Sequence, residues 1–170
     1  MLDLYHQTVA GVSTRAKVRV RWYGRTESKG LNSRLEIKHR VNAIGAKAIH
    51  TLAPFSPHTL RKLSGTMVMA ADYERQQIIE IVHPLRPTAT IQYDRRYYHA
   101  ADGRFFFTVD DRLFYGKPGG GCRVQMRDTF VLELKYDSSN DEEARTLVTG
   151  FPGRLTRNSK YVNAIEKLYL

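Results

Sequence analysis

The chain has 170 residues, 42% hydrophobic and 26% charged, a composition typical of a globular protein and not of a disordered one. It carries 27 Lys and Arg against 17 Asp and Glu, and the net charge of +10 predicts a polyanionic partner: nucleic acid, an anionic membrane surface or a phosphate-rich small molecule. A lone cysteine, Cys122, excludes an internal disulfide and a cysteine zinc cluster, and the absence of a long apolar run favours a soluble, cytoplasmic protein, with attachment to a membrane through a partner protein left open.

The segment "RAKVRVRWYG", residues 15–24, alternates strictly between charged and apolar residues. Arg15, Lys17, Arg19 and Arg21 share one side, and small or apolar residues occupy the other. This pattern predicts a β-strand that ends at Gly24. The basic side is either an ordinary solvated face or, in an enclosed space, a face that requires bound anions.

Residues 34–41, "RLEIKHRV", repeat the design, and residues 45–52 are predicted to form a further short strand that carries Lys47. Two helices are expected next, over residues 56–65 and 69–84, which end at Gly65 and Pro84.

The second half of the chain returns to strands. We expect them over residues 88–99, 104–116 and 129–137, with the glycine-rich residues 116–122 as a hairpin-like connection. A short helix is expected to begin within residues 138–148. Residues 157–170 predict a C-terminal helix, capped by Asn158 or Ser159, with Tyr161, Ile165 and Leu168 on its buried side.

Four of these strands combine a face of Arg, Lys, Glu and Tyr with an apolar face. In an open sheet the charged faces would meet solvent, whereas in a closed barrel they would line the lumen and the apolar faces would pack against helices. A lumen with so many charges would be a wet binding site for a polyanion and its metal, because unpaired buried charge is too costly. The expected fold is therefore α+β, an antiparallel β-barrel with flanking helices.

Six sequence blocks occur in an order that resembles the vacuolar transporter chaperone (VTC) domain. They are "KVRVRWYG", "LEIKHR", "YDR", "TVD", "VLELKY" and "SKY", and they span residues 17–161. The VTC domain is the polyphosphate polymerase branch of the triphosphate tunnel metalloenzymes. The resemblance implies one tunnel domain over residues 1–170, built in the family from eight antiparallel strands. Because family members begin with additional strands, it also implies that this chain lacks the first one or two.

The resemblance further implies an enzyme that transfers the γ-phosphate of ATP to polyphosphate with Mn²⁺ or Mg²⁺. The catalytic positions that it implies are Arg19, Arg21, Lys38 and Arg95. The substrate-binding positions are Lys17, Lys47, Tyr93, Arg104, Lys135, Ser159 and Lys160. Glu133 is implied as the metal ligand, and the guanidinium forks suit phosphate because each binds two oxygens at once.

One position departs from the family pattern. The block that ends in "TVD" has Phe106 where the family has an arginine, and Arg104, one pleat back on the same face, is the expected substitute.

Several alternatives stay open at this level. A triphosphate hydrolase of the same superfamily and a non-catalytic module for polyphosphate or inositol phosphates both fit the residues, whereas the aromatic residues do not form the stacking platform of a nucleic-acid reader. Glu36 fits either an ion pair with Arg34 or Arg40 or a metal site, and Glu133 fits a salt bridge to Lys135. A turn is favoured for Asp110 and Asp111 over a second metal position. The oligomeric state is not predicted.

Overall fold

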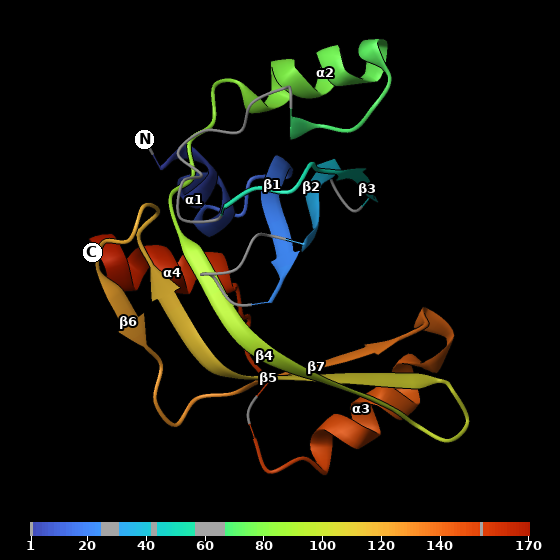
Figure 1. The fold of residues 1–170 in the computed structure, drawn as a ribbon. Coiled ribbons are helices and arrows are strands. Elements are labelled where there is room, and N and C mark those ends of the chain that lie inside the picture. The colour runs from blue at the N-terminus through green and yellow to red at the C-terminus, as the bar shows by residue number, and fades with distance from the viewer. Residues whose placement is uncertain (1, 25–30, 42–43, 57–66, 154) are drawn as a thin grey trace. The chain divides into compact units, whose positions relative to one another are not determined.

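The computed structural model describes residues 2–24, 31–41, 44–56, 67–153 and 155–170. The chain divides into two compact units, the first comprising Met1–Thr90 with Lys117–Cys122 and the second Ile91–Gly116 with Arg123–Leu170. Each unit contains one antiparallel sheet, and helices precede or follow its strands in the sequence (Figure 1).

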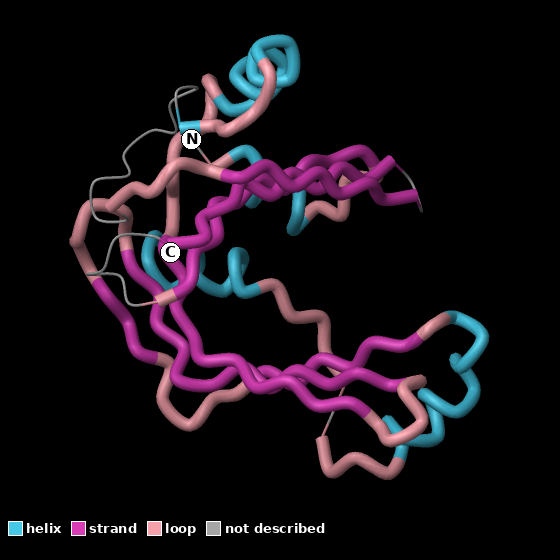
Figure 2. Tube along the Cα trace, turned by 45° about the vertical axis from the view of Figure 1, so that its right-hand side comes forward, coloured by secondary structure: helices cyan, strands magenta, loops and turns pink. Residues whose placement is uncertain are grey.

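The first unit contains three strands in the order β1-β2-β3, namely β1 (Thr14–Tyr23), β2 (Leu31–Val41) and β3 (Ile44–Thr51). They agree with the predicted strands to within a few residues and lie side by side along the trace in Figure 2. A short helix that the sequence did not predict, α1 (Asp3–Val9), precedes them and contacts β1.

The apolar face of this sheet packs on helix α2 (Asp72–Val82), which lies inside the predicted range of residues 69–84. Leu35 and Ile37 of β2 form one cluster with Ile78 and Val82 of α2, and all four side chains are at most 3% exposed. The apolar residues of β2 therefore face the helix and its charged residues lie on the other face, as the alternating sequence predicted. Apart from Ser56, the helix predicted over residues 56–65 lies outside the described residues.

The second unit is organised around its longest strand, β5 (Phe105–Gly116). Strand β4 (Thr90–His99) is one neighbour. Strand β7 (Val131–Tyr136) pairs with the first half of β5, and β6 (Arg123–Gln125) pairs with its last three residues. The short β6 was not predicted, because three residues after a glycine-rich connection carry too little pattern to identify a strand.

Helix α3 (Asp141–Thr149) follows a 3₁₀ turn over Ser138–Asn140, where the sequence predicted a helix start. Helix α4 (Lys160–Tyr169) packs against β5, and the backbone N–H of Val162 donates to the Ser159 hydroxyl at 3.4 Å, so that Ser159 is the cap. Ile165 and Leu168 are buried as predicted, but Ala164 takes the third buried position and Tyr161 is only partly buried.

The α+β class is confirmed, but the barrel is not. The strands in the described part of the chain form two sheets, of three and of four strands, and no closed barrel is found among them. Among the same residues, every helix is too short or too polar to span a bilayer.

Candidate functional site

In the first unit, four cationic side chains surround the carboxylate of Glu36, which is 3% exposed. Arg19 donates from Nε and Nη2 to Oε2 at 2.7 and 2.5 Å, and Lys47 Nζ lies 3.3 Å from the same oxygen. Arg21 and Arg34 approach Oε1 with their Nε atoms at 3.7 and 3.5 Å. The cluster therefore carries a surplus of positive charge around one buried acid.

The surrounding cations decide the protonation state of Glu36. Burial alone would raise its pKa, but the hydrogen bond from Arg19 and the charges of Arg19 and Arg21 outweigh this, and the pKa lies below its ordinary value. The carboxylate is thus ionised at neutral pH. Of the two alternatives for Glu36, the contacts support the ion pair, with Arg34 among its partners.

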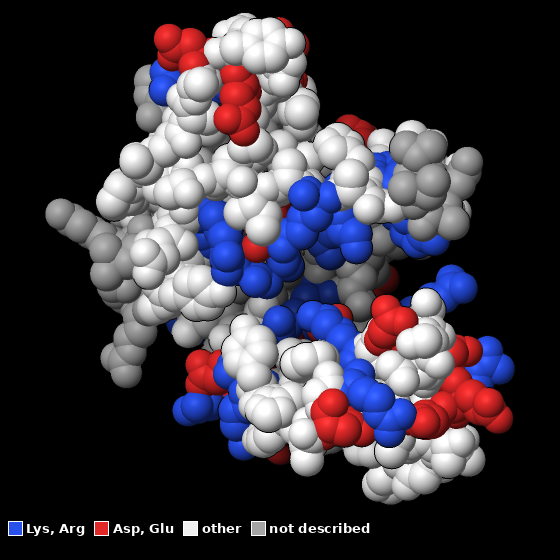
Figure 3. Space-filling view, turned by 90° about the vertical axis from the view of Figure 1, so that its right-hand side faces the viewer, with Lys and Arg blue, Asp and Glu red and all other residues white. Residues whose placement is uncertain are grey.

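Beside this cluster, three lysines form one row across the sheet. The strand register places Lys17 opposite Lys38, and Lys38 opposite Lys47. All three residues are exposed, and like charges placed directly opposite each other destabilise a sheet. Figure 3 shows Lys and Arg side chains gathered on the surface of this unit. Repulsion along this row is offset in part at Lys47, whose Nζ lies 3.3 Å from Glu36 Oε2, and a bound anion would offset it further.

The second unit has a similar cluster around Asp110, which is 1% exposed. Arg95 of β4 donates from Nε and Nη2 to its two oxygens at 2.5 and 2.7 Å, and Lys160 of α4 contacts Oδ2 at 2.6 Å. The expectation of a turn at Asp110 and Asp111 was wrong, because both residues lie within β5. The Asp110 carboxylate pairs there with cations from two other elements. Burial would raise the pKa of Asp110, but the hydrogen bonds from Arg95 and Lys160 outweigh it and lower the pKa.

The ring of Tyr93 is part of the same cluster. Arg95 Cζ lies 5.2 Å and Lys160 Nζ 5.1 Å from its centroid, so that both cations interact with one aromatic ring. Tyr97 adds a second ring, 5.8 Å from Arg95. The structure thus brings together Tyr93 and Arg95 of the "YDR" block and Lys160 of the "SKY" block, which are far apart in the sequence.

The remaining predicted residues of this unit are more exposed. Glu133 and Lys135 of β7 are about half exposed, at 49% and 56%, with Lys135 Nζ 3.7 Å from the Glu133 carboxylate. Glu133 is paired with Thr108 of β5, two residues before Asp110, so both acids lie on one face of the sheet. Ser159 caps α4 beside the cluster.

Arg104 and Phe106 do not contribute to the Asp110 cluster in the described structure. Arg104 donates to Asp102 at 2.8 Å and to Glu143 of α3 at 2.5 Å. Phe106 is 51% exposed and lies opposite Lys135 in the strand register. The arginine position that Phe106 replaces is therefore not filled by the side chain of Arg104.

The family model described as VTC domain matches residues 1–169. The chain belongs to the VTC domain family. This family is associated with polyphosphate polymerase and phosphotransferase activity. No curated protein and no solved structure matches the chain.

A divalent metal in this VTC domain would have few protein ligands. Across the described residues, no three His, Cys, Asp or Glu side chains lie close enough together to hold an ion. The carboxylates of Glu36 and Asp110 are each ion-paired with arginine and lysine side chains. The half-exposed carboxylate of Glu133 fits Mg²⁺ or Mn²⁺ only as one ligand among phosphate oxygens and water, which is a usual arrangement for Mg²⁺.

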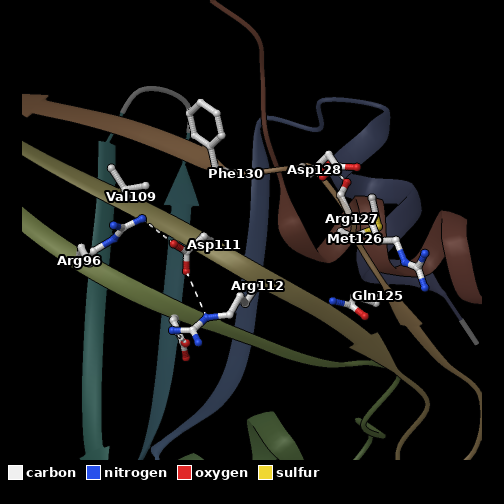
Figure 4. Close-up of a pocket in the computed structure, with 11 residues that line it drawn as sticks. Arg96, Val109, Asp111, Arg112, Gln125, Met126, Arg127, Asp128 and Phe130 are labelled. Atoms are coloured by element: carbon white, nitrogen blue, oxygen red, sulfur yellow. Dashed lines mark hydrogen bonds and ion pairs between the residues drawn. The ribbon is translucent and has the colours of Figure 1, made fainter.

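The opposite face of the second sheet has a different character. A cavity of about 1040 Å³ is lined there by residues of β4, β5, the end of β6 and the segment between β6 and β7. Its charges pair with one another: Arg96 contacts Asp111 at 2.5 Å, and Arg112 contacts Asp94 and Asp111 (Figure 4). Arg112 has φ 49°, an irregularity that breaks the alternation of β5 and lets Asp111 and Arg112 line the same cavity. This face lacks the cationic surplus of the other one.

Sequence reasoning found the cations and offered the ion pair of Glu36 with Arg34, but it missed the ion pairs of Asp110. The signal for Glu36 was its place as the one acid in an alternating cationic face. The signal for Asp110 was its place at the end of the "TVD" block, directly before Asp111. Apart from Arg34, which the sequence offered as a partner of Glu36, the partners lie on other elements and neither signal identifies them.

Proposed function

We propose that this VTC domain transfers the γ-phosphate of ATP to the end of a polyphosphate chain and releases ADP. The observation that carries the proposal is the pair of cation clusters, around Glu36 and around Asp110, at the positions that the family resemblance implied. The proposal includes the tunnel fold that the family resemblance implies.

The chemistry requires positioning and charge neutralisation more than covalent help from the protein. A terminal oxygen of polyphosphate attacks the γ-phosphorus, the bond from that phosphorus to the β,γ-bridging oxygen breaks, and ADP leaves with the bond's electron pair. The acceptor is itself a phosphate, so no side chain acts as a nucleophile. Arg19, Arg21, Lys38 and Arg95 would hold phosphoryl oxygens and stabilise the charge that builds up on them.

The other predicted positions have supporting roles in this proposal. Lys17, Lys47, Tyr93, Lys135, Ser159 and Lys160 would contact the nucleotide or the polymer. Glu133 would hold Mn²⁺ or Mg²⁺, which supplies positive charge to the phosphate oxygens when bound.

The test is incubation of the chain with [γ-³²P]ATP, Mn²⁺ and a short polyphosphate primer, with products resolved by length. We expect labelled polymer that grows as ADP is released, loss of the polymer with Arg21→Ala, and retention with Arg145→Ala. Arg145 is a matched control because its ion pair with Asp141 lies within the exposed surface of α3. Labelled orthophosphate as the sole product would instead assign a hydrolase.

A binding-only module is the second candidate, favoured by the exposed Phe106 and by the engagement of Arg104 with Asp102 and Glu143. It would bind polyphosphate or inositol phosphates without turnover. Calorimetric binding of tripolyphosphate that weakens steeply with salt, together with no labelled product, would support this candidate.

A further inference from the structure

Arg19 and Arg95 are attached to their carboxylates by the same edge. Arg19 uses Nε and Nη2, at 2.7 and 2.5 Å from Glu36. Arg95 uses Nε and Nη2 as well, at 2.5 and 2.7 Å from Asp110. The two sites lie in different units and on different sheets, so the shared geometry is not a consequence of one local structure.

A lysine completes each site. Lys47 Nζ lies 3.3 Å from Glu36 Oε2, and Lys160 Nζ lies 2.6 Å from Asp110 Oδ2. Each unit therefore contains an arginine, a buried carboxylate and a lysine that meet at one point. All four of these cations are positions that the resemblance assigned to catalysis or substrate binding.

The edge that binds the carboxylate determines which N–H donors of the guanidinium can still bind another group. A guanidinium presents five N–H donors in a rigid fork, two of them on Nη1. With the Nε–Nη2 edge held by a carboxylate, the Nη1–Nη2 end is still available for a second two-oxygen partner. Among the residues that the structure describes, no hydrogen bond to Nη1 of Arg19 or Arg95 is found.

We infer that Glu36 and Asp110 are positioning residues, which fix Arg19 and Arg95 so that the Nη1–Nη2 end of each guanidinium is directed at phosphate oxygens. The inference rests on the proposed function, and it gives the two buried acids a role that neither a metal site nor simple packing would supply.

The burial of the carboxylates makes them suitable for this role. Glu36 is 3% and Asp110 1% exposed, and each lies on a strand with two paired neighbours: β2 lies between β1 and β3, and β5 pairs with β4 and, at Asp110, with β7. Their arginines come from the adjacent strands β1 and β4. Such a carboxylate has little freedom to move, and a buried ion pair is retained only if its geometry is good. The orientation of the guanidinium is therefore set before any phosphate arrives.

The experiment compares Asp110→Asn, Arg95→Lys and the double variant with the unchanged chain, by kcat and KM for ATP and by calorimetric binding of tripolyphosphate. A misplaced guanidinium is expected to lower kcat on the order of 100-fold. Tripolyphosphate affinity should stay the same or increase in Asp110→Asn, because a negative charge has been removed beside the anion. The double variant should be no worse than its worse single variant, because Asp110 acts through Arg95.

Asp111→Asn is the matched control, since it is the next residue on the strand and pairs with Arg96 on the opposite face. It should leave kcat unchanged. A parallel loss of affinity and kcat in Asp110→Asn, with additive losses in the double variant, would assign a merely structural role to Asp110 and overturn the inference. Unchanged kcat and KM in Asp110→Asn would also overturn it. Glu36→Gln and Arg19→Lys repeat the test in the first unit, and decide it if Asp110→Asn fails to fold.

Failure of the proposed function is distinguishable from failure of this inference. If the unchanged chain neither binds tripolyphosphate nor forms polymer, the proposed function is wrong. The hydrogen bond between Arg95 and Asp110 is then followed by NMR through the Nε–H proton of Arg95. This proton should exchange slowly with solvent in the unchanged chain and in Asp111→Asn. Fast exchange in Asp110→Asn supports the positioning role, and unaltered exchange contradicts it.

Discussion

Lys17 and Lys38 lie directly opposite each other on β1 and β2, and Lys47 continues their row onto β3. A folded sheet that places three ammonium groups in one row loses stability to repulsion, in the range of about 0.2–1 kcal/mol for each directly opposed pair. A bound polyanion would offset this repulsion.

The first prediction follows from this row. Lys38→Gln should raise the free energy of unfolding by about 0.2–1 kcal/mol at low ionic strength, because it removes the central charge. It should also reduce the stabilisation that tripolyphosphate confers on the folded chain. Urea denaturation with and without tripolyphosphate measures both effects. Lys167→Gln, at an exposed position of α4, is the control and should show neither. A lower stability of Lys38→Gln without ligand would contradict the prediction.

The second prediction concerns pH. Glu36 and Asp110 have pKa values below their ordinary values of 4.5 and 3.8 in the folded chain, since their cationic partners outweigh the effect of burial. A group with a lowered folded pKa contributes stability above its unfolded pKa, and this contribution is lost as the pH falls through the folded value. The free energy of unfolding should therefore fall steadily from about pH 4.5 downward.

Urea denaturation between pH 7 and pH 3 checks this dependence. In Glu36→Gln and Asp110→Asn the curve should be flatter below pH 4.5 than in the unchanged chain, because one titrating carboxylate is gone. An equally steep curve in all three proteins would show that other acids cause the acid sensitivity.

The sequence predicted those parts of the fold that depend on local alternation. β1 and β2 have a period of two over eight residues, with charged residues on one face and mostly apolar residues on the other. The same pattern located Arg95 and Glu133 on their strands. The block order then assigned roles that the residues alone would not have supplied.

Features that depend on distant contacts were not predictable. Asp110 looks like a turn residue next to Asp111, and only the meeting of β4, β5 and α4 shows that it binds Arg95 and Lys160. The ion pair of Arg104 with Glu143 joins residues 39 positions apart in the sequence. Helix α1 and strand β6 are too short for a periodic signal. Closure of a barrel is likewise a matter of long-range strand pairing, and no local pattern specifies it.

The third prediction separates two roles for Ser159, which caps α4 and was also predicted to bind substrate. Ser159→Ala should lower the free energy of unfolding by about 1 kcal/mol, because the backbone N–H of Val162 loses its side-chain acceptor. Ser159→Asp should keep the cap, since Asp is among the preferred capping residues. If Ser159 also contacts phosphate, the aspartate should weaken tripolyphosphate binding through charge repulsion. Unchanged binding in a stable Ser159→Asp protein would limit Ser159 to capping.

The fourth prediction is a gain of function at Phe106. The side chain is 51% exposed, lies opposite Lys135, and stands where the VTC family pattern has an arginine. Because the position is half exposed, Phe106→Arg should cost little stability. It should strengthen tripolyphosphate binding at low salt by about tenfold or more, the effect of one added hydrogen bond to a charged group. Calorimetry over a salt series measures the affinity. Phe130→Arg is the matched control, because it adds the same charge at a 60% exposed phenylalanine that lines the opposite-face cavity. Equal gains from both variants would show that general charge, and not the restored position, is responsible.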